Sequence, residues 1–147
     1  MYKNILVPID GSKLSDKASR EAIGLARATG AKVTLFHCAA DFPPPVYMES
    51  AILAAQVTAG AFRKQAVKHA QEVLEKAAKR LAGDVRIDTL HAVSELPYDA
   101  IISAAAKVKA DLIVMASHGR RGLSGFLLGS ETQKVLTRSK VPVLVVR

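Results

Sequence analysis

The feature that most constrains this chain is a set of short apolar runs separated by segments with helical spacing. Ile5-Leu6-Val7, residues 112–115 and residues 143–146 are continuously apolar and do not alternate with polar positions. Continuous runs of this length are typical of strands buried on both faces, as in a parallel sheet covered by helices. The sequence therefore predicts an α/β fold.

The order of the predicted elements gives the topology. Ala18, Ala22 and Ala26 share a helical face, Gly30 follows as a stop, and Pro97 suits a first helical position. Strands are predicted at 2–9, 31–39, 84–92, 111–116 and 141–146, and helices at 15–29, 62–81, 97–110 and 130–138. This alternation predicts an open, five-stranded parallel sheet, doubly wound with helices on both faces, in one domain covering residues 1–147. Residues 41–60 hold consecutive prolines and are predicted to begin as a stiff, exposed loop, whereas residues 47–60 either extend the next helix backwards or form a mobile cover over a neighbouring site.

Composition narrows the class of protein. The chain has 147 residues, a net charge of +8, 5% aromatic residues and no Trp. The charge favours anionic partners, but the scarcity of stacking side chains makes nucleic-acid binding the weakest reading. Cys38 has no partner for an internal disulfide, and no apolar stretch is long enough for a membrane helix or resembles a cleavable leader. We therefore expect a cytoplasmic protein without a membrane segment.

The last predicted strand begins at Val141 and ends at Val146. Pro142 within it lacks an N–H group, which favours an edge position. An apolar edge left bare is hazardous, so pairing with a second copy of the chain is expected, giving a homodimer.

Unusual residues collect where three predicted strands end. These are Pro8-Ile9-Asp10-Gly11-Ser12, His37-Cys38 and Ala116-Ser117-His118-Gly119. Ligands of open α/β sheets bind beyond the carboxyl ends of the strands, so one rim is expected to carry the site. The loop from Ala116 to Ser130 is rich in glycine, hydroxyl groups and arginine, including Arg120 and Arg121.

This loop has the composition of a phosphate site. Glycine lets backbone N–H groups approach an anion, or turns them inward at positive φ, and Gly119 and Gly129 are the best candidates. Ser130 stands where a helix begins, so the free N–H groups there suit a phosphate, although Ser130 could equally cap its own helix. Asp10 likewise fits either a ligand contact or a turn cap, and Glu131 most simply complements the helix dipole.

The loop, Pro8-Ile9-Asp10-Gly11-Ser12 and the closing run from Val141 resemble the universal stress protein family along the whole chain. ATP-binding members of that family carry a glycine, two residues, a second glycine, nine residues and then Gly-Ser or Gly-Thr. Gly119, Gly129 and Ser130 match that pattern, whereas Ala116 replaces the first glycine.

The resemblance implies a Rossmann-like fold of the adenine nucleotide alpha-hydrolase type and a homodimeric stress or signalling protein that binds ATP, with or without Mg²⁺. By resemblance, Asp10 contacts the ribose or a phosphate-bound metal, the Cys38 backbone meets the adenine edge, and Met115 lines the pocket. The implied ligand-contacting residues are Pro8, Ile9, Asp10, Cys38, Met115, Ala116, His118, Gly119, Gly129, Ser130 and Glu131. Ala116 is expected to lower affinity more readily than to prevent binding.

The residues leave two alternative functions open and exclude several other classes of protein and site. A slow Mg²⁺-dependent ATPase using Asp10 and a dimeric interaction module without nucleotide are the alternatives. The P-loop and the GxGxxG dinucleotide fingerprint do not occur in the sequence. A receiver domain needs an acidic pair after the first strand, where Asp10 stands without an acidic neighbour, and His37 and His118 lack the spacing of a zinc site.

Overall fold

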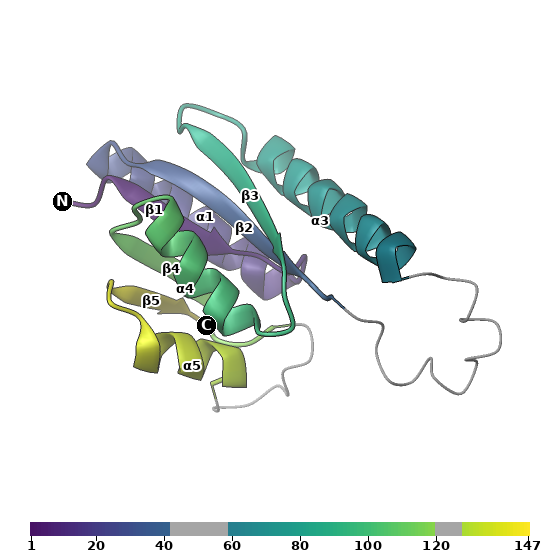
Figure 1. The fold of residues 1–147 in the computed structure, drawn as a ribbon. Coiled ribbons are helices and arrows are strands. Elements are labelled where there is room, and N and C mark those ends of the chain that lie inside the picture. The colour runs from purple at the N-terminus through teal and green to yellow at the C-terminus, as the bar shows by residue number, and fades with distance from the viewer. Residues whose placement is uncertain (42–58, 120–127) are drawn as a thin grey trace.

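The computed structural model describes residues 1–41, 59–119 and 128–147. Arg120 and Arg121 lie outside these ranges, as do most of residues 41–60. Strands and helices alternate along the described chain as the sequence predicts (Figure 1). The elements are β1 (Asn4–Pro8), α1 (Lys13–Thr29), β2 (Lys32–Ala39), α3 (Ala59–Leu81), β3 (Ile87–Val93), α4 (Pro97–Lys107), β4 (Leu112–Ala116), α5 (Ser130–Arg138) and β5 (Val143–Val146).

The sheet confirms the predicted architecture. Its strand order is β3-β2-β1-β4-β5, and each neighbouring pair is parallel. From β1 the chain moves outward to β2 and β3, then returns to the other side of β1 for β4 and β5. The strand order therefore reverses between β1 and β4, and β5 lies at an edge of the sheet.

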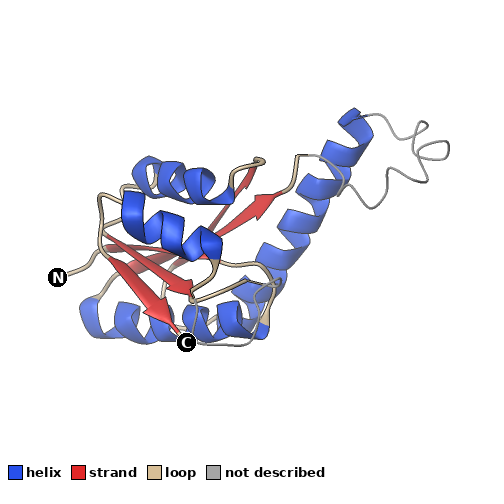
Figure 2. Cartoon of the chain, turned by 90° about the horizontal axis from the view of Figure 1, so that it is seen from below, coloured by secondary structure: helices blue, strands red, loops and turns tan. Residues whose placement is uncertain are grey.

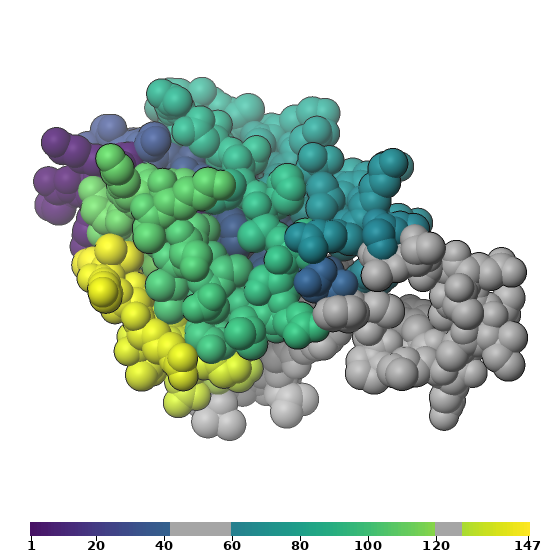
Figure 3. Space-filling view, viewed as in Figure 1, coloured from purple at the N-terminus to yellow at the C-terminus, as the bar shows by residue number. Residues whose placement is uncertain are grey.

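Two helical layers cover the sheet (Figure 2). On one face, α1 and α3 pack against a core that includes Val7, Val33 and Val114. On the other face, α4 and α5 pack against Leu6, Phe36 and Ile113, and Figure 3 shows these two helices, green and yellow, over that side. Because successive strand residues point to opposite faces, the apolar runs supply both cores, which is why they do not alternate with polar residues.

The helix boundaries have local causes. The Ser12 side chain accepts a hydrogen bond from the Ser15 N–H and caps α1, which therefore starts at Lys13 and two residues earlier than predicted. Gly30 ends α1 with φ 70° in the left-handed region. The prediction that the helix from Pro97 continues to residue 110 is wrong, because Lys109 has φ 53° and reverses the chain after α4 ends at Lys107.

None of the described helices is both long and apolar enough to cross a bilayer.

Candidate functional site

The residues that follow β1 and β4 meet at the point where the strand order reverses. β1 and β4 are paired neighbours, with Ile5 opposite Leu112, so their carboxyl ends open at the same rim. A Cβ added to Gly119 would lie 2.9 Å from Asp10 Oδ2. A side chain at position 119 would have to displace the Asp10 carboxylate, and the structure brings together these two predicted site residues.

Asp10 also shapes its own turn. Its Oδ1 accepts a hydrogen bond of 2.9 Å from the Ser12 N–H. This is the turn-capping role that the sequence left open. The other oxygen, Oδ2, is the one that faces Gly119. Oδ1 of Asp10 therefore stabilises the turn before α1, while Oδ2 lies against Gly119 in the segment that follows β4.

After β4 the chain comes back to the rim at Gly129, just before α5. The Gly129 N–H donates to the Ser117 carbonyl oxygen at 2.8 Å, and a Cβ on Gly129 would lie 3.0 Å from His118 Cα. Gly129 has φ −59°, and among the described glycines the positive values belong to Gly11 and Gly30, so positive φ, one of the two reasons that the sequence offered for glycine, does not apply at 119 or 129. Close approach of two backbone segments is the reason for glycine at 129.

The N-terminus of α5 opens beside this contact. Gly129 occupies the N-cap position and has no side chain with which to accept the first-turn N–H groups. Ser130 is the first helical residue and is exposed, so the reading in which its hydroxyl caps the helix is wrong. Thr132 is buried and donates its hydroxyl to the Ala116 carbonyl at 2.9 Å, which ties the helix to the end of β4.

Glu131 points away from the rim and toward α4. Its Oε2 accepts a 2.8 Å hydrogen bond from the Tyr98 N–H in the first turn of α4, and its Oε1 lies 3.0 Å from Lys134 Nζ. The carboxylate therefore caps α4, whose N-cap residue, Leu96, makes no side-chain capping bond. At a ligand in the rim, Glu131 has only its backbone N–H to offer. Sequence reasoning missed this cap because nothing local to Tyr98 indicates a partner 33 residues away.

Met115 and Ala116 end β4 on opposite faces. Met115 is buried in the core under α4 and α5, whereas the Ala116 methyl belongs to the core under α1 and α3. Ala116 has extended strand geometry and is not among the residues with positive φ. Its backbone therefore has no need of glycine, and its methyl group packs among apolar side chains.

Cys38 reaches the rim from β2. Burial raises the pKa of its thiol to about 11, and the charge of Glu131 contributes in the same direction. The thiol is therefore almost entirely protonated near pH 7 and is a poor nucleophile. The carbonyl of Phe36 faces β1, where it accepts from the Ile9 N–H, and that of Ala39 faces β3. By this alternation the Cys38 peptide groups are directed toward the β1 side, beyond Pro8, the last residue of β1.

Two histidines have partners at the rim. His37 Nδ1 lies 2.8 Å from the Ile9 carbonyl oxygen, and its ring meets His69 edge-on at 6.2 Å between centroids. His118 Nδ1 lies 3.2 Å from Ser117 Oγ. Within residues 1–41, 59–119 and 128–147, no three His, Cys, Asp or Glu side chains gather as a metal site would require.

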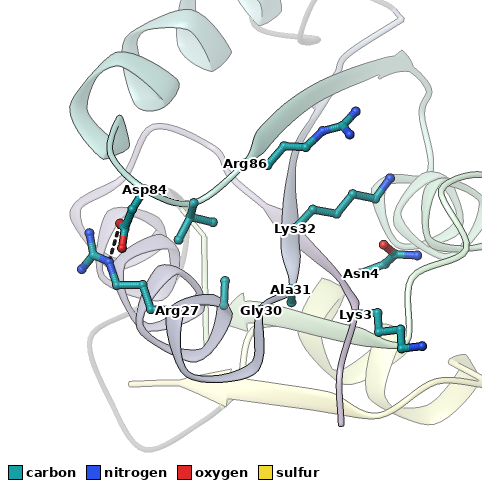
Figure 4. Close-up of a pocket in the computed structure, with 10 residues that line it drawn as sticks. Lys3, Asn4, Arg27, Gly30, Ala31, Lys32, Asp84 and Arg86 are labelled. Carbon is teal, nitrogen blue, oxygen red and sulfur yellow. Dashed lines mark hydrogen bonds and ion pairs between the residues drawn. The ribbon is translucent and has the colours of Figure 1, made fainter.

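A basic hollow of about 460 Å³ lies at the opposite end of the sheet (Figure 4). Lys3, Lys32 and Arg86 line it beside the amino ends of the strands, while Arg27 is paired with Asp84 at 2.8 Å. The C-terminus of α1 also faces this end, and its partial negative charge opposes anion binding. The rim at Asp10 and Gly129 is the better candidate site.

Comparisons with known proteins identify the family of the chain and agree with its fold. The model of the Universal stress protein family matches residues 1–147. A universal stress protein of Thermus aquaticus is 36% identical over 150 residues, covering 100% of both chains. Among solved structures, the protein MJ0577 superposes with a TM-score of 0.81 at 28% identity, over 99% of this chain and 96% of that one. A universal stress protein in complex with cAMP superposes with a TM-score of 0.71 at 30% identity, over 99% of this chain and 97% of that one.

Proposed function

Since the chain belongs to the universal stress protein family, we propose that it binds an adenine nucleotide at the rim between β1 and β4, and that the ligand is ATP. The observation that carries the proposal is that Gly129, the N-cap residue of α5, supplies no capping side chain at a helix start beside the contact between Asp10 and Gly119. Free N–H groups at a helix start, reached past a glycine, are the donors that phosphates prefer. A similar protein was solved with cAMP, which supports adenine as the base.

The donors at the rim suggest a role for each part of the nucleotide. The phosphates are proposed to lie on the N–H groups of Ser130 and Glu131, with Gly129 and His118 beside them. The Cys38 peptide groups are proposed to meet the adenine edge, since they face the β1 side beyond Pro8. Met115 is proposed as part of the pocket wall. These roles use backbone atoms at several positions, so the side chains there are open to variation.

Asp10 is proposed to contact the ribose or a phosphate-bound Mg²⁺ through Oδ2. Its Oδ1 already accepts the Ser12 N–H. One carboxylate is a sparse ligand set for Mg²⁺, which usually keeps several waters and shares phosphate oxygens. We therefore propose that Mg²⁺, where it takes part, arrives with the triphosphate.

Ala116 is compatible with this proposal. The resemblance to the family places a glycine at this position in ATP-binding members. Here the methyl group packs in the core under α1 and α3 and the backbone is extended. The cost to affinity is proposed to be small, and Ala116→Gly is expected to change affinity less than Ser130→Asp.

The homodimer is proposed to form through β5. This strand lies at the edge of the sheet, and Leu144 within it is 41% exposed although it is a large apolar residue. A bare apolar edge strand favours pairing with a second chain. Light scattering of the purified protein tests this: a mass of twice 15.7 kDa is expected, and a monomer would refute the assignment.

Calorimetric titration with AMP, cAMP and ATP, with and without Mg²⁺, tests nucleotide binding. The most informative variant is Ser130→Asp, because a carboxylate at the first position of α5 stabilises the helix but repels a phosphate. Gln71→Asp on the exposed face of α3 is the matched charge control. Gly129→Asp is a poor choice, since any Cβ there meets His118.

We expect the wild type and Gln71→Asp to bind alike and Ser130→Asp to bind at least tenfold more weakly, at unchanged or higher thermal stability. Equal binding by Ser130→Asp would move the phosphates away from α5. Wild-type protein that ignores all three nucleotides would instead favour the dimeric interaction module.

A further inference from the structure

We infer that His37 is a positioning residue for the nucleotide site, because its ring anchors the Ile9 carbonyl and so fixes the segment that presents Asp10. The inference rests on the proposed adenine-nucleotide site and adds to it a side chain that would not itself touch the ligand. It follows from a contact between β2 and Ile9, the residue that follows β1.

The geometry places His37 behind the rim. His37 is half-buried, its ring meets His69 of α3 edge-on and so lies on the α3 side of the sheet, and its Nδ1 lies 2.8 Å from the Ile9 carbonyl oxygen. The Ile9 N–H donates to the Phe36 carbonyl at 2.8 Å. Both backbone polar groups of Ile9 are therefore held by consecutive residues of β2.

This contact fixes the position of the ring proton. A carbonyl oxygen can only accept a hydrogen bond, so the ring must carry a proton on Nδ1. Both the Nδ1–H neutral tautomer and the imidazolium satisfy this requirement, whereas the Nε2–H neutral tautomer does not.

Anchoring Ile9 matters because both oxygens of the next residue, Asp10, have to keep close contacts. Asp10 Oδ1 must reach the Ser12 N–H at 2.9 Å, while Oδ2 lies where a Cβ on Gly119 would be only 2.9 Å away. The β1–β2 ladder ends at Pro8, opposite Phe36. Beyond this point the His37 ring continues the attachment of the chain to β2, so that Asp10 is held at the rim.

Two isosteric substitutions separate positioning from mere packing. In His37→Asn the amide nitrogen is as far from Cβ as Nδ1 is in histidine, so it can still donate to Ile9. In His37→Gln the amide lies one bond further out, in the manner of Nε2. His91, in register with His37 on β3 and one strand further from β1, provides the matched control His91→Gln.

AMP titration and amide hydrogen exchange of Ser12 are the two readouts. We expect His37→Gln to lose about five- to tenfold in AMP affinity, the size of one hydrogen bond, and to exchange the Ser12 amide faster. His37→Asn and His91→Gln should stay within about twofold of the wild type in AMP affinity. In the free wild-type protein, ¹⁵N spectra should report a protonated Nδ1 on His37.

Three results would overturn the inference: an unprotonated Nδ1, unchanged Ser12 exchange in His37→Gln, or equal losses in His37→Asn and His37→Gln. Wild-type protein that does not bind AMP, cAMP or ATP refutes the proposed function instead. In that case the tautomer and the Ser12 exchange still decide whether His37 holds the segment. The two failures are therefore distinguishable.

Discussion

Gly129→Ala should destabilise the protein even though alanine suits the backbone there. Gly129 has φ −59° and ψ 147°, a conformation open to any residue. An added Cβ would lie 3.0 Å from His118 Cα, 3.2 Å from His118 Cβ and 3.3 Å from the Ser117 carbonyl oxygen. The hydrogen bond of 2.8 Å from Gly129 to Ser117 keeps the two segments together. The methyl group therefore has to displace backbone atoms.

The magnitude is the difference of two effects. Overpacking of this kind costs roughly 1–3 kcal/mol, and replacing glycine where the backbone allows it returns about 0.4–1 kcal/mol through the unfolded state. We expect a net loss of about 1 kcal/mol, seen as a lower midpoint in urea by about 0.5 M for a slope near 2 kcal/mol/M.

Gly24→Ala is the matched control. Gly24 is an exposed residue of α1, and a Cβ there meets no described atom within 4 Å. This variant should gain about 0.5–1 kcal/mol, because glycine is costly inside a helix. The two alanine variants should thus move in opposite directions in the same urea titration. A Gly129→Ala protein as stable as Gly24→Ala would refute the tight contact between Gly129 and His118.

Three further measurements test contacts at the rim and beside it. Gly119→Ala should push the Asp10 carboxylate aside and weaken ATP binding by about tenfold with little change in melting temperature, because the side chain can rotate; equal affinity by calorimetry would contradict the contact. Glu131→Ala should cost about 1 kcal/mol in urea unfolding by uncapping Tyr98, whereas Glu131→Gln, which keeps an acceptor oxygen, should cost less; equal losses would refute the cap. Cys38 should react slowly with a disulfide reagent at pH 7, where a pKa of about 11 leaves roughly one thiol in ten thousand ionised, and its rate should keep rising with pH up to about 11; a plateau near pH 9 would exclude the raised pKa.

The fold was predictable because it depends on patterns that are local in sequence. Continuous apolar runs such as Ile5-Leu6-Val7 indicate a strand buried on both faces, and their alternation with helices leaves few topologies. The start of α5 at Ser130 also agrees with the prediction from the sequence. The end of α4 was missed because Lys109 takes a left-handed conformation that a lysine does not signal.

The candidate site was predictable in position but not in detail. The order of strands places Asp10 and Gly119 at one rim, as expected for a switch point. The reasons for individual residues depend on contacts between distant segments. Gly129 packs on His118, and Glu131 caps a helix that begins 34 residues earlier, at Pro97. No local pattern carries such information.

The peptide groups on either side of Ser117 have a consequence for the sheet edge. The Ser117 carbonyl receives the Gly129 N–H, while its own N–H donates to the Val146 carbonyl at 2.8 Å. An edge strand of uniformly apolar residues is weakly specified in register, since a slip exchanges one apolar side chain for another. Here the last hydrogen bond between β4 and the edge strand β5 is made by Ser117, which also accepts the Gly129 N–H just before α5. The register of β5 and the position of Gly129 therefore both depend on the peptide groups of Ser117.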